Sequence, residues 1–352
     1  MKLARTKIYE LHLPMKFTFK HAEAERSEGS AVLVRLEDAE GNLGWGECAP
    51  RLYVTQETVE SVVDNLKELF GTELLGMDFG DFEGVITFIK DRLEQLPRNQ
   101  HAAFCAAELA LLDIAGKVFG KSAGEVLGPR QNAQVHYSLV LTAGDIEQAT
   151  QHCMLGKKFQ MQTVKLKVGA DAEKDKALLG TARQILGANC GMRIDANMAW
   201  SAEEAISRLE QLKEFNLQGI EQPLRPDDIE GYIWLTERSP VPVIVDETLV
   251  SYEDAEMLID KKGCDIFNIR ISKCGGLSNS ARIRDLAERR GMGYMMGAQV
   301  GETAILTAAG RHFATHSAHT SFCEGSFGSF LMEADVAVEN LTFGPRGVGP
   351  AL

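Results

Sequence analysis

The feature that most limits the possible folds is a repeated alternation of short β-forming runs with amphipathic helical runs after residue 129. The runs are rich in β-branched and apolar residues and recur roughly every 25 residues. They are VHYSLVL (135–141), TVKLKV (163–168), GMRIDAN (191–197), GIEQP (219–223), PVIVDE (242–247), DIFNIR (265–270), GYMMGA (293–298) and HTSFCE (319–324). Helical patterns fill the gaps, for example at 202–214, 252–262 and 277–290. Eight such units predict a (β/α)8-type barrel over residues 129–325.

A doubly wound α/β sheet is the alternative fold for such an alternation. It requires a phosphate-binding glycine motif after an early strand, and none of the eight runs carries GxGxxG. The segment GKVFGKS (116–122) resembles a P-loop but is one residue short and follows a helical pattern. We therefore interpret it as a helix end that is capped by glycine.

The first 128 residues follow a different pattern. The segment AVLVRLEDAEGNLGWGE (31–47) has two β-forming runs around an EGN turn, which predicts a hairpin. From residue 57 to residue 127, apolar residues recur at three- and four-residue spacing, which predicts helices. The breaker cluster GPRQN (128–132) marks a boundary. We expect a separate α+β domain over residues 1–128, beside the barrel.

Composition narrows the possible partners. A net charge of −13 argues against a nucleic-acid or membrane-surface partner, because both require a basic face. The chain has neither an apolar run of about 18 residues nor a signal-peptide core. Its seven cysteines form no CxxC pair, which favours reduced thiols. We expect a cytoplasmic protein.

Polar residues stand at the ends of five successive runs. Each end is separated from the next by one β/α unit. Because catalytic groups of a barrel gather at the C-terminal ends of its strands, these side chains should share one mouth. They are Lys165 and Lys167, then Asp195, Glu221, Asp246, and finally Asn268 with Arg270.

This arrangement predicts a metal site with a base beside it. Three converging carboxylates, Asp195, Glu221 and Asp246, would repel one another without a cation, and Mg²⁺ prefers such oxygen ligands. A lysine held among cations loses its proton more readily and can act as a general base. A metal that binds a substrate carboxylate stabilises the enediolate that is left when the α-proton is removed. Ordinary ion pairs inside a barrel would explain one such residue but not five strand ends in register.

At these residues the sequence resembles the enolase superfamily and, within it, the muconate lactonizing enzyme subgroup. The segment GNLGWGECAP resembles the capping domain of that family. Further motifs follow in family order over nearly the whole chain. They are AAELALLDIAGKVFG (106–120), KLK (165–167), IDAN (194–197), IEQP (220–223), VDET (245–248) and SKCGG (272–276).

The resemblance implies a modified (β/α)7β barrel with an N-terminal α+β capping domain, to which the C-terminal segment 326–352 returns. Relatives are usually homo-oligomers, and the same is expected here. The resemblance also implies a set of roles: Mg²⁺ ligation by Asp195, Glu221 and Asp246, and proton abstraction by Lys167 with Lys165 beside it.

Three positions depart from the family pattern. The sixth strand ends in Arg270 where the subgroup has a lysine, three residues before Lys273. Arginine practically never loses its proton, which weakens a racemase or epimerase reading with one base on each face. Relatives that epimerise dipeptides carry an Asp-x-Asp clamp for the substrate ammonium, whereas this chain has Phe322-Cys323-Glu324 and keeps only Glu324. The seventh strand end, MGAQVGE, lacks the histidine of the mandelate racemase subgroup.

Several further residues are candidates for substrate contact. The loops 16–29 and 49–58 should close over the mouth, as in the family, and contribute Phe19, His21 and Tyr53. The barrel itself offers Asn197, Asn268, Lys273 and Glu324. His312, His316 and His319 lack a zinc motif and are better explained as structural or surface histidines.

We therefore expect a Mg²⁺-dependent enzyme that removes a proton α to the carboxylate of a small molecule. Isomerisation of the cycloisomerase or epimerase type is the family outcome. Elimination, as in o-succinylbenzoate synthase or a dehydratase, is the close alternative, because it needs one base only. A Schiff-base aldolase that uses Lys167 is a remote alternative. A binding protein that has lost turnover is another.

Overall fold

The N-terminal part of the computed structural model is built around a three-stranded antiparallel sheet. The structure describes residues 1–21, 24–141, 146–169 and 171–352, without the side chains of 17–21, 24–26 and 329. The strands are β1 (Leu3–His21), β2 (Ala24–Asp38) and β3 (Leu43–Cys48), in the order β1-β2-β3. The β2–β3 pair confirms the hairpin predicted around the EGN turn.

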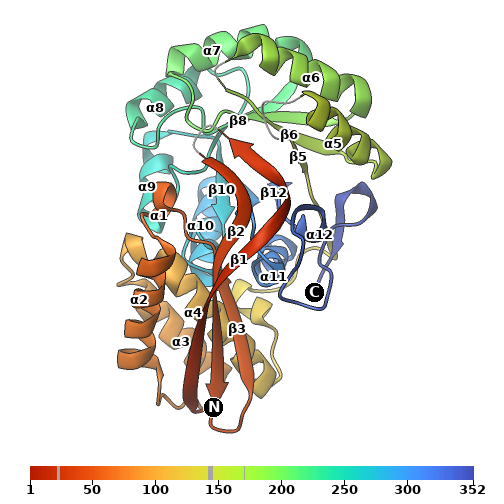
Figure 1. Cartoon of the computed structure of the whole chain (residues 1–352). Helices are drawn as coiled ribbons and strands as arrows, with labels where there is room; N and C mark the ends of the chain where they lie inside the picture. Colours follow the sequence, from red (N-terminus) through yellow and green to blue (C-terminus); the bar gives the residue numbers. More distant parts are fainter. Residues whose placement is uncertain (22–23, 142–145, 170) are drawn as a thin grey trace.

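Helices cover one face of this sheet (Figure 1). They are α2 (Val59–Leu69), α3 (Phe82–Leu93) and α4 (His101–Phe119), whereas the four-residue helix α1 (Leu52–Thr55) lies apart from them (Figure 1). Helix α4 lies so close to β3 that a Cβ on Gly44 or Gly46 would overlap its backbone carbonyls. The two glycines therefore let the most buried helix of this part pack directly on the strand.

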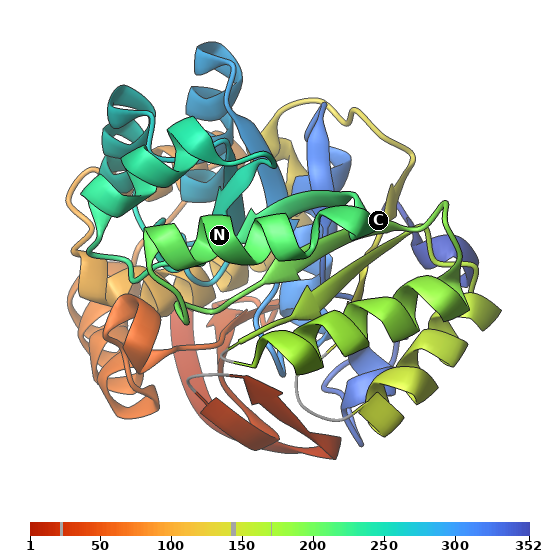
Figure 2. The ribbon, with the colours of Figure 1, turned by 90° about the horizontal axis from the view of Figure 1, so that it is seen from above.

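The barrel is an eight-stranded parallel sheet in the order β5 to β12. Its two edge strands are joined by a hydrogen bond in which the Ser138 N–H donates to the Cys323 carbonyl over 2.8 Å. Viewed from above, the connecting helices surround the strands (Figure 2). The strands are β5 (Leu139–Leu141), β6 (Thr163–Lys167), β7 (Gly191–Asp195), β8 (Leu217–Glu221), β9 (Val243–Val245), β10 (Ile266–Arg270), β11 (Gly293–Gly297) and β12 (Thr320–Cys323).

In the described part of the chain, one α-helix connects each strand of the barrel to the next. This alternation confirms the modified (β/α)7β barrel, and α10 has the predicted bounds. The helices are α5 (Ile146–Lys158), α6 (Ala172–Leu186), α7 (Ala202–Gln211), α8 (Ile229–Arg238), α9 (Tyr252–Lys261), α10 (Leu277–Arg290) and α11 (Ala304–Thr315). None of the helices among the described residues combines the length and the apolar character needed to cross a bilayer.

The first barrel strand differs from the prediction. The run 135–141 was expected to form one strand, but it is divided into β4 (Gln134–His136) and β5. Strand β4 leaves the barrel and pairs with β13 (Val348–Pro350). Between them the Tyr137 N–H donates to the Gly347 carbonyl, so a long-range contact ends the strand early.

The C-terminal segment contacts both parts of the molecule. It begins with the short helix α12 (Gly328–Leu331), after which Met332 forms an isolated bridge with Met15 of β1. Strand β2 also reaches the barrel, because a Cβ on Gly29 would overlap the Gly301 carbonyl that follows β11. These contacts place the ends of β1 and β2 at the mouth of the barrel.

Candidate active site

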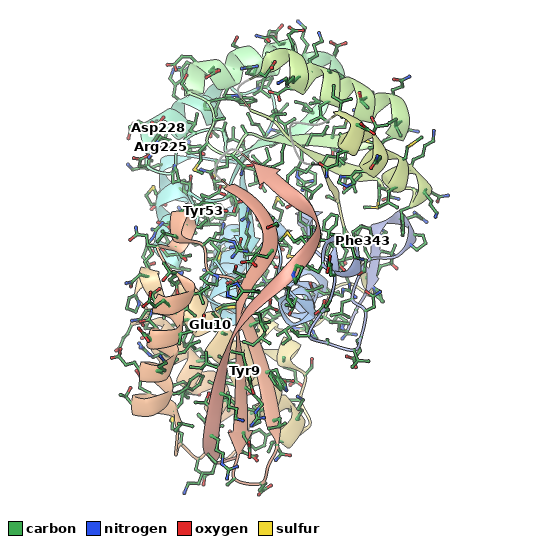
Figure 3. All side chains as sticks on the ribbon, viewed as in Figure 1. Tyr9, Glu10, Tyr53, Arg225, Asp228 and Phe343 are labelled. Carbon is green, nitrogen blue, oxygen red and sulfur yellow. The ribbon has the colours of Figure 1, made fainter. Side chains whose placement is uncertain are left out.

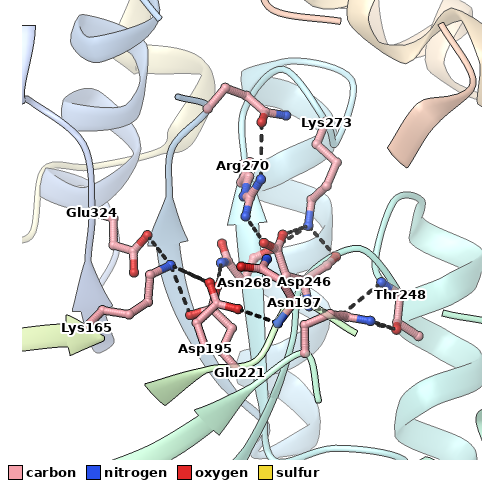
Figure 4. A network of polar contacts seen from close by, with 12 residues as sticks. Lys165, Asp195, Asn197, Glu221, Asp246, Thr248, Asn268, Arg270, Lys273 and Glu324 are labelled. Carbon is pink, nitrogen blue, oxygen red and sulfur yellow. Dashed lines mark hydrogen bonds and ion pairs between the residues drawn. The ribbon is translucent and has the colours of Figure 1, made fainter. Parts of the chain in front are cut away.

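Strand register brings the predicted polar residues together at one end of the barrel. Lys167 is paired with Asp195 across β6 and β7, and Asp195 with Glu221 across β7 and β8. Asp246 directly follows β9, and Arg270 ends β10. All five side chains are buried. Because of this register, side chains that are one β/α unit apart in the sequence lie together in one cluster (Figure 4).

Lys165 lies at the centre of three carboxylates. Its Nζ is 3.1 Å from Glu221 Oε1, 2.8 Å from Glu324 Oε2 and 3.3 Å from Asp195 Oδ2. Burial raises the pKa of Glu221, and the nearby Asp195 and Glu324 carboxylates oppose the lowering effect of Lys165. Lys165 is therefore fully engaged as a counter-ion.

Lys167 has fewer partners and lines a cavity above the cluster. Its Nζ lies 2.9 Å from Asp195 Oδ2 and 2.6 Å from Asn197 Oδ1. Asn197 adopts a left-handed conformation with φ of 45°, and its N–H donates to Asp195 Oδ1. Burial alone would raise the pKa of Asp195, but the charges of Lys167 and Lys165 outweigh burial and hold it well below its usual range.

Asp246 is held from two sides by cations. Lys273 Nζ lies 2.9 Å from Asp246 Oδ1 and also donates to the Asp246 and Asn268 carbonyls. The Arg270 guanidinium forms an ion pair with Asp246 Oδ2 and donates to Gln299 Oε1 over 3.2 Å. Burial lowers the pKa of Lys273 to about 8. Arg270 lines the cavity, whereas Lys273 is not among its lining residues in the described part of the chain.

Asn268 supports the cluster from beneath. Its Nδ2 donates to Glu221 Oε1 over 2.9 Å, and it is completely buried. A Cβ on Gly297 of the next strand would overlap the Asn268 side chain. Asn268 is thus held against Glu221 and is not among the residues that line the cavity in the described part of the chain.

Arg193 is a member of the cluster that sequence reasoning missed. It forms an ion pair with Glu324, its Nη1 donates to Ser138 Oγ over 3.0 Å, and its guanidinium lies 4.4 Å from the centre of the Phe322 ring. Burial would raise the pKa of Glu324, but Lys165 and Arg193 lower it to about 2. Arg193 precedes Asp195 by two residues and so shares its strand face, which was the available signal.

The cavity above the cluster has a volume of about 170 Å³. Six of the predicted site residues line it: Tyr53, Lys165, Lys167, Asn197, Arg270 and Glu324. Tyr53 and Phe343, two lining residues from distant segments, are labelled in Figure 3. The backbone of Phe19 and His21 belongs to β1, but their side chains lie outside the described residues.

Two further carboxylates line the cavity and were not predicted to contact a substrate. Glu302 accepts a hydrogen bond from the Gln299 N–H, and burial raises its pKa to about 8. Glu247 follows Asp246, and burial raises its pKa to about 7. Within the described residues, Glu247 Oε2 has no hydrogen-bond partner. Both side chains line the cavity, and the Glu247 oxygen is available to a bound molecule.

The three strand-end carboxylates match Mg²⁺ by their donor chemistry. Asp195, Glu221 and Asp246 offer only oxygen atoms, are completely buried, and stand on adjacent strands. The described residues contain no group of three Asp, Glu, His or Cys side chains already arranged around one point. Lysine and arginine nitrogens instead contact each carboxylate, which shows that positive charge is stabilised there.

Two family models match this chain. The family model "Enolase C-terminal domain-like" matches residues 147–345. The model "Mandelate racemase / muconate lactonizing enzyme, N-terminal domain" matches residues 4–128.

Individual relatives differ in their reactions. The hydrophobic dipeptide epimerase of Enterococcus faecalis is 28% identical over 314 residues, which are 89% of this chain and 87% of that protein. The o-succinylbenzoate synthase of Bacillus subtilis is 28% identical over 312 residues, which are 88% and 81% of the two chains. A crystal structure of the dipeptide epimerase from Enterococcus faecalis, complexed with Mg and L-Leu-L-Tyr, has a TM-score of 0.90 at 24% identity and covers 100% of this chain and 98% of that one. The chain is thus similar over most of its length to both an epimerase and a synthase.

Proposed function

The chain belongs to the mandelate racemase/muconate lactonizing enzyme group of the enolase superfamily, and on that premise we propose that it removes the proton α to the carboxylate of a small molecule. The observation that carries the proposal is the buried cluster in which Lys167 contacts Asp195 at the floor of a cavity. Lysine as a base, carboxylates for a cation and a bounded cavity are what this chemistry requires.

We propose Mg²⁺ as the cofactor, held by Asp195, Glu221 and Asp246. When bound, Mg²⁺ supplies positive charge that stabilises the enediolate form of a substrate carboxylate. The carboxylates are already paired with lysine and arginine side chains. The positive charge of bound Mg²⁺ would attract an anionic substrate. It would also favour the neutral form of a nearby lysine amine, which is the form that can accept a proton.

Lys167 is the proposed base. It lines the cavity, and contacts from Asp195 and Asn197 fix the direction of its Nζ. Lys165 shares the same strand face but is surrounded by three carboxylates, so its role is to neutralise them. A proton removed from the substrate would accordingly reside on Lys167 Nζ.

Arg270 occupies the opposite role. Its guanidinium contacts Asp246 and Gln299. Arginine side chains have no acceptor nitrogen that could serve as a base. It can orient a carboxylate or stabilise developing negative charge, but it cannot abstract a proton.

Isomerisation of the cycloisomerase or epimerase type is the outcome we propose from the family, and of the two the cycloisomerase type is compatible with a single base at Lys167. The specific observation that Arg270 replaces a second base favours elimination as the second candidate, as in the o-succinylbenzoate synthase relative. The boundary at residue 128, the homo-oligomeric assembly and the cytoplasmic location remain predictions.

The test is a screen in D₂O with Mg²⁺ over N-acyl amino acids, dipeptides, muconates and hydroxy acids, read by mass spectrometry. We expect α-deuteration or turnover of a carboxylate that disappears with EDTA and in Lys167→Ala but persists in Lys213→Ala, a substitution of an exposed surface lysine. Activity that is insensitive to EDTA, together with a borohydride-trapped adduct at Lys167, would contradict the proposal and support the aldolase alternative.

A further inference from the structure

The cavity has two chemically different ends. The polar end is formed at the strand ends by Lys165, Lys167 and Arg270. The other end is formed by α5, the segment after it and the C-terminal segment. We propose that the substrate joins its carboxylate to a bulky apolar group and has no free ammonium group near that apolar end. This inference rests on the proposed function and specifies its substrate class.

Aromatic rings dominate the apolar end. Phe343 lies 5.4 Å from both Phe327 and Phe330, and Phe159 lies 5.4 Å from Phe330, measured between ring centres. Leu155 and Leu331 complete this surface. Phe327, Phe330 and Phe159 are only partly buried although each contacts the Phe343 ring, and all three line the cavity, so part of their ring surface is open to it. Such a surface binds an aromatic or branched aliphatic group by burying apolar area.

Among the residues that the structure describes, no carboxylate belongs to the apolar end. The carboxylates that line the cavity in the described part of the chain are Glu247, Glu302 and Glu324, and all three follow barrel strands. The titratable group among the apolar lining residues is His152, and burial lowers its pKa, which favours the neutral ring. An ammonium placed there would be desolvated without a partner, at a substantial cost.

Glu324 joins the two ends, since Phe327 follows it by three residues. It is the carboxylate most suitably placed to bind an ammonium, but both of its oxygens are already engaged. Oε2 accepts from Lys165 over 2.8 Å, and Oε1 forms an ion pair with Arg193. With two cations on one carboxylate, a third would be repelled rather than bound.

The experiment uses three matched probes with Mg²⁺ and the full chain, and measures dissociation constants by calorimetry. N-(3-phenylpropanoyl)-L-alanine carries the ring and no ammonium. N-propanoyl-L-alanine lacks the ring, and L-phenylalanyl-L-alanine adds the ammonium. We expect the first probe to bind about tenfold or more tightly than either of the others. The inference is overturned if the dipeptide binds as tightly as its counterpart without the ammonium, or if the ring adds less than about twofold.

Variants of residues at the apolar end test whether that surface causes the preference for the ring-bearing probe. Phe330→Ala should reduce the ratio between the ring-bearing and the ring-free probe to about threefold or less, because it removes ring surface from the apolar end. Leu331→Ala tests the same surface if Phe330→Ala does not fold, as judged by circular dichroism. Phe88→Ala is the matched control, because Phe88 contacts Phe79 in the N-terminal part. An unchanged ratio in a folded Phe330→Ala or Leu331→Ala protein contradicts the inference.

The two proposals fail separately. Ring-dependent binding with no exchange of the α-hydrogen for any compound contradicts the proposed function and leaves the inference standing. Mg²⁺-dependent exchange that is equally fast with and without the ring, and that also occurs with the dipeptide that carries the ammonium, contradicts the inference alone.

Discussion

Buried carboxylates occur both at the barrel mouth and at the contact between the N-terminal part and the barrel, and the two regions hold them differently. At the mouth, Asp195 and Glu324 face lysine and arginine side chains, which lower their pKa values despite burial. At the contact, Glu47 and Glu108 accept hydrogen bonds from neutral donors, and burial raises the pKa of each to about 7. The same chemical group is thus kept charged at Asp195 and Glu324 and made easier to protonate at Glu47 and Glu108, as it also is at Glu247 and Glu302 of the cavity lining.

The neutral donors belong to the first turns of barrel helices. Glu47 of β3 accepts from the Thr303 N–H over 2.7 Å and the Leu306 N–H over 2.9 Å at the start of α11. Glu108 of α4 accepts from the Ser278 N–H over 2.9 Å at the start of α10. These glutamates cap helices from another part of the chain and so join the two parts. At the mouth, in contrast, Asp195 and Glu324 are kept charged by neighbouring lysine and arginine side chains, beside the proposed cation site.

Asp195→Asn should produce the largest difference between the regions. It removes a proposed metal ligand and leaves Lys167 without its ionic partner, so we expect kcat to fall by about 10³-fold or more and Mg²⁺ binding to weaken sharply. Glu221→Gln and Asp246→Asn should act alike. Calorimetry with Mg²⁺ checks the binding, with Glu108→Gln as a control that keeps the metal. Parent-like Mg²⁺ binding by all three mouth variants would show that the ligands are misassigned.

Arg193→Met tests the ionic character of the mouth and keeps all three proposed metal ligands, although Arg193 Nε also lies 3.9 Å from Glu221 Oε2. Removing one cation of a buried pair leaves Glu324 undercompensated, which should cost about 3–5 kcal/mol of unfolding free energy. Glu47→Gln at the contact should cost about 1 kcal/mol, since only hydrogen bonds change. Urea unfolding at pH 7 measures both variants. Equal losses would mean that the two regions do not differ in kind.

The pH dependence of stability should have opposite signs for Glu47 and Glu108 on one side and the charge-paired Glu324 on the other. Between pH 4.5 and about 7, folded Glu47 and Glu108 keep protons that the unfolded chain has lost, so stability falls as pH rises, by about 1–3 kcal/mol at each site. Glu324, whose pKa is lowered to about 2, instead adds stability as pH rises from about 2 to 4.5. The difference between the unfolding midpoints at pH 5 and pH 8 should be smaller in Glu108→Gln than in the parent protein. A parent-like difference in that variant would rule out the assigned role of Glu108.

The smallest expected effect concerns the backbone at the contact. Gly276 has φ of 98°, and a Cβ there would overlap the Glu108 carboxylate, so Gly276→Ala should cost about 1–3 kcal/mol. Gly291→Ala, with φ of 68° and open space around the new Cβ, should cost about 1 kcal/mol. Thermal unfolding of the two variants isolates the steric contribution of Glu108. Identical shifts of the unfolding temperature in the two variants would show that the Glu108 carboxylate makes no steric contribution at position 276.

Local periodicity was sufficient to predict the barrel, because each strand and helix is encoded by adjacent residues. Helix α10 has the predicted bounds for that reason. The first strand was predicted wrongly because Tyr137 pairs with Gly347, a contact between distant segments that no local pattern records.

Part of the candidate site was likewise predicted from the pattern of single strands. Alternation along single strands was enough to identify Lys167, Asp195 and Arg270 as members of one mouth. Arg193 shows the same alternation, but its partner Glu324 lies 131 residues away. The caps made by Glu47 and Glu108 likewise depend on how two parts of the chain meet. Charge pairing across the fold is therefore what sequence reasoning could not supply.

The central claim is that Lys167 is the single base and Arg270 is not one. The most direct measurement is NMR of a chiral substrate turned over in D₂O by the parent, Lys167→Ala and Arg270→Lys proteins. We predict that the parent introduces deuterium in one configuration only, that Lys167→Ala introduces none, and that Arg270→Lys retains exchange and adds slow racemisation by restoring a second base. Equal deuterium incorporation into both configurations by the parent protein would contradict the account, because it requires two working bases.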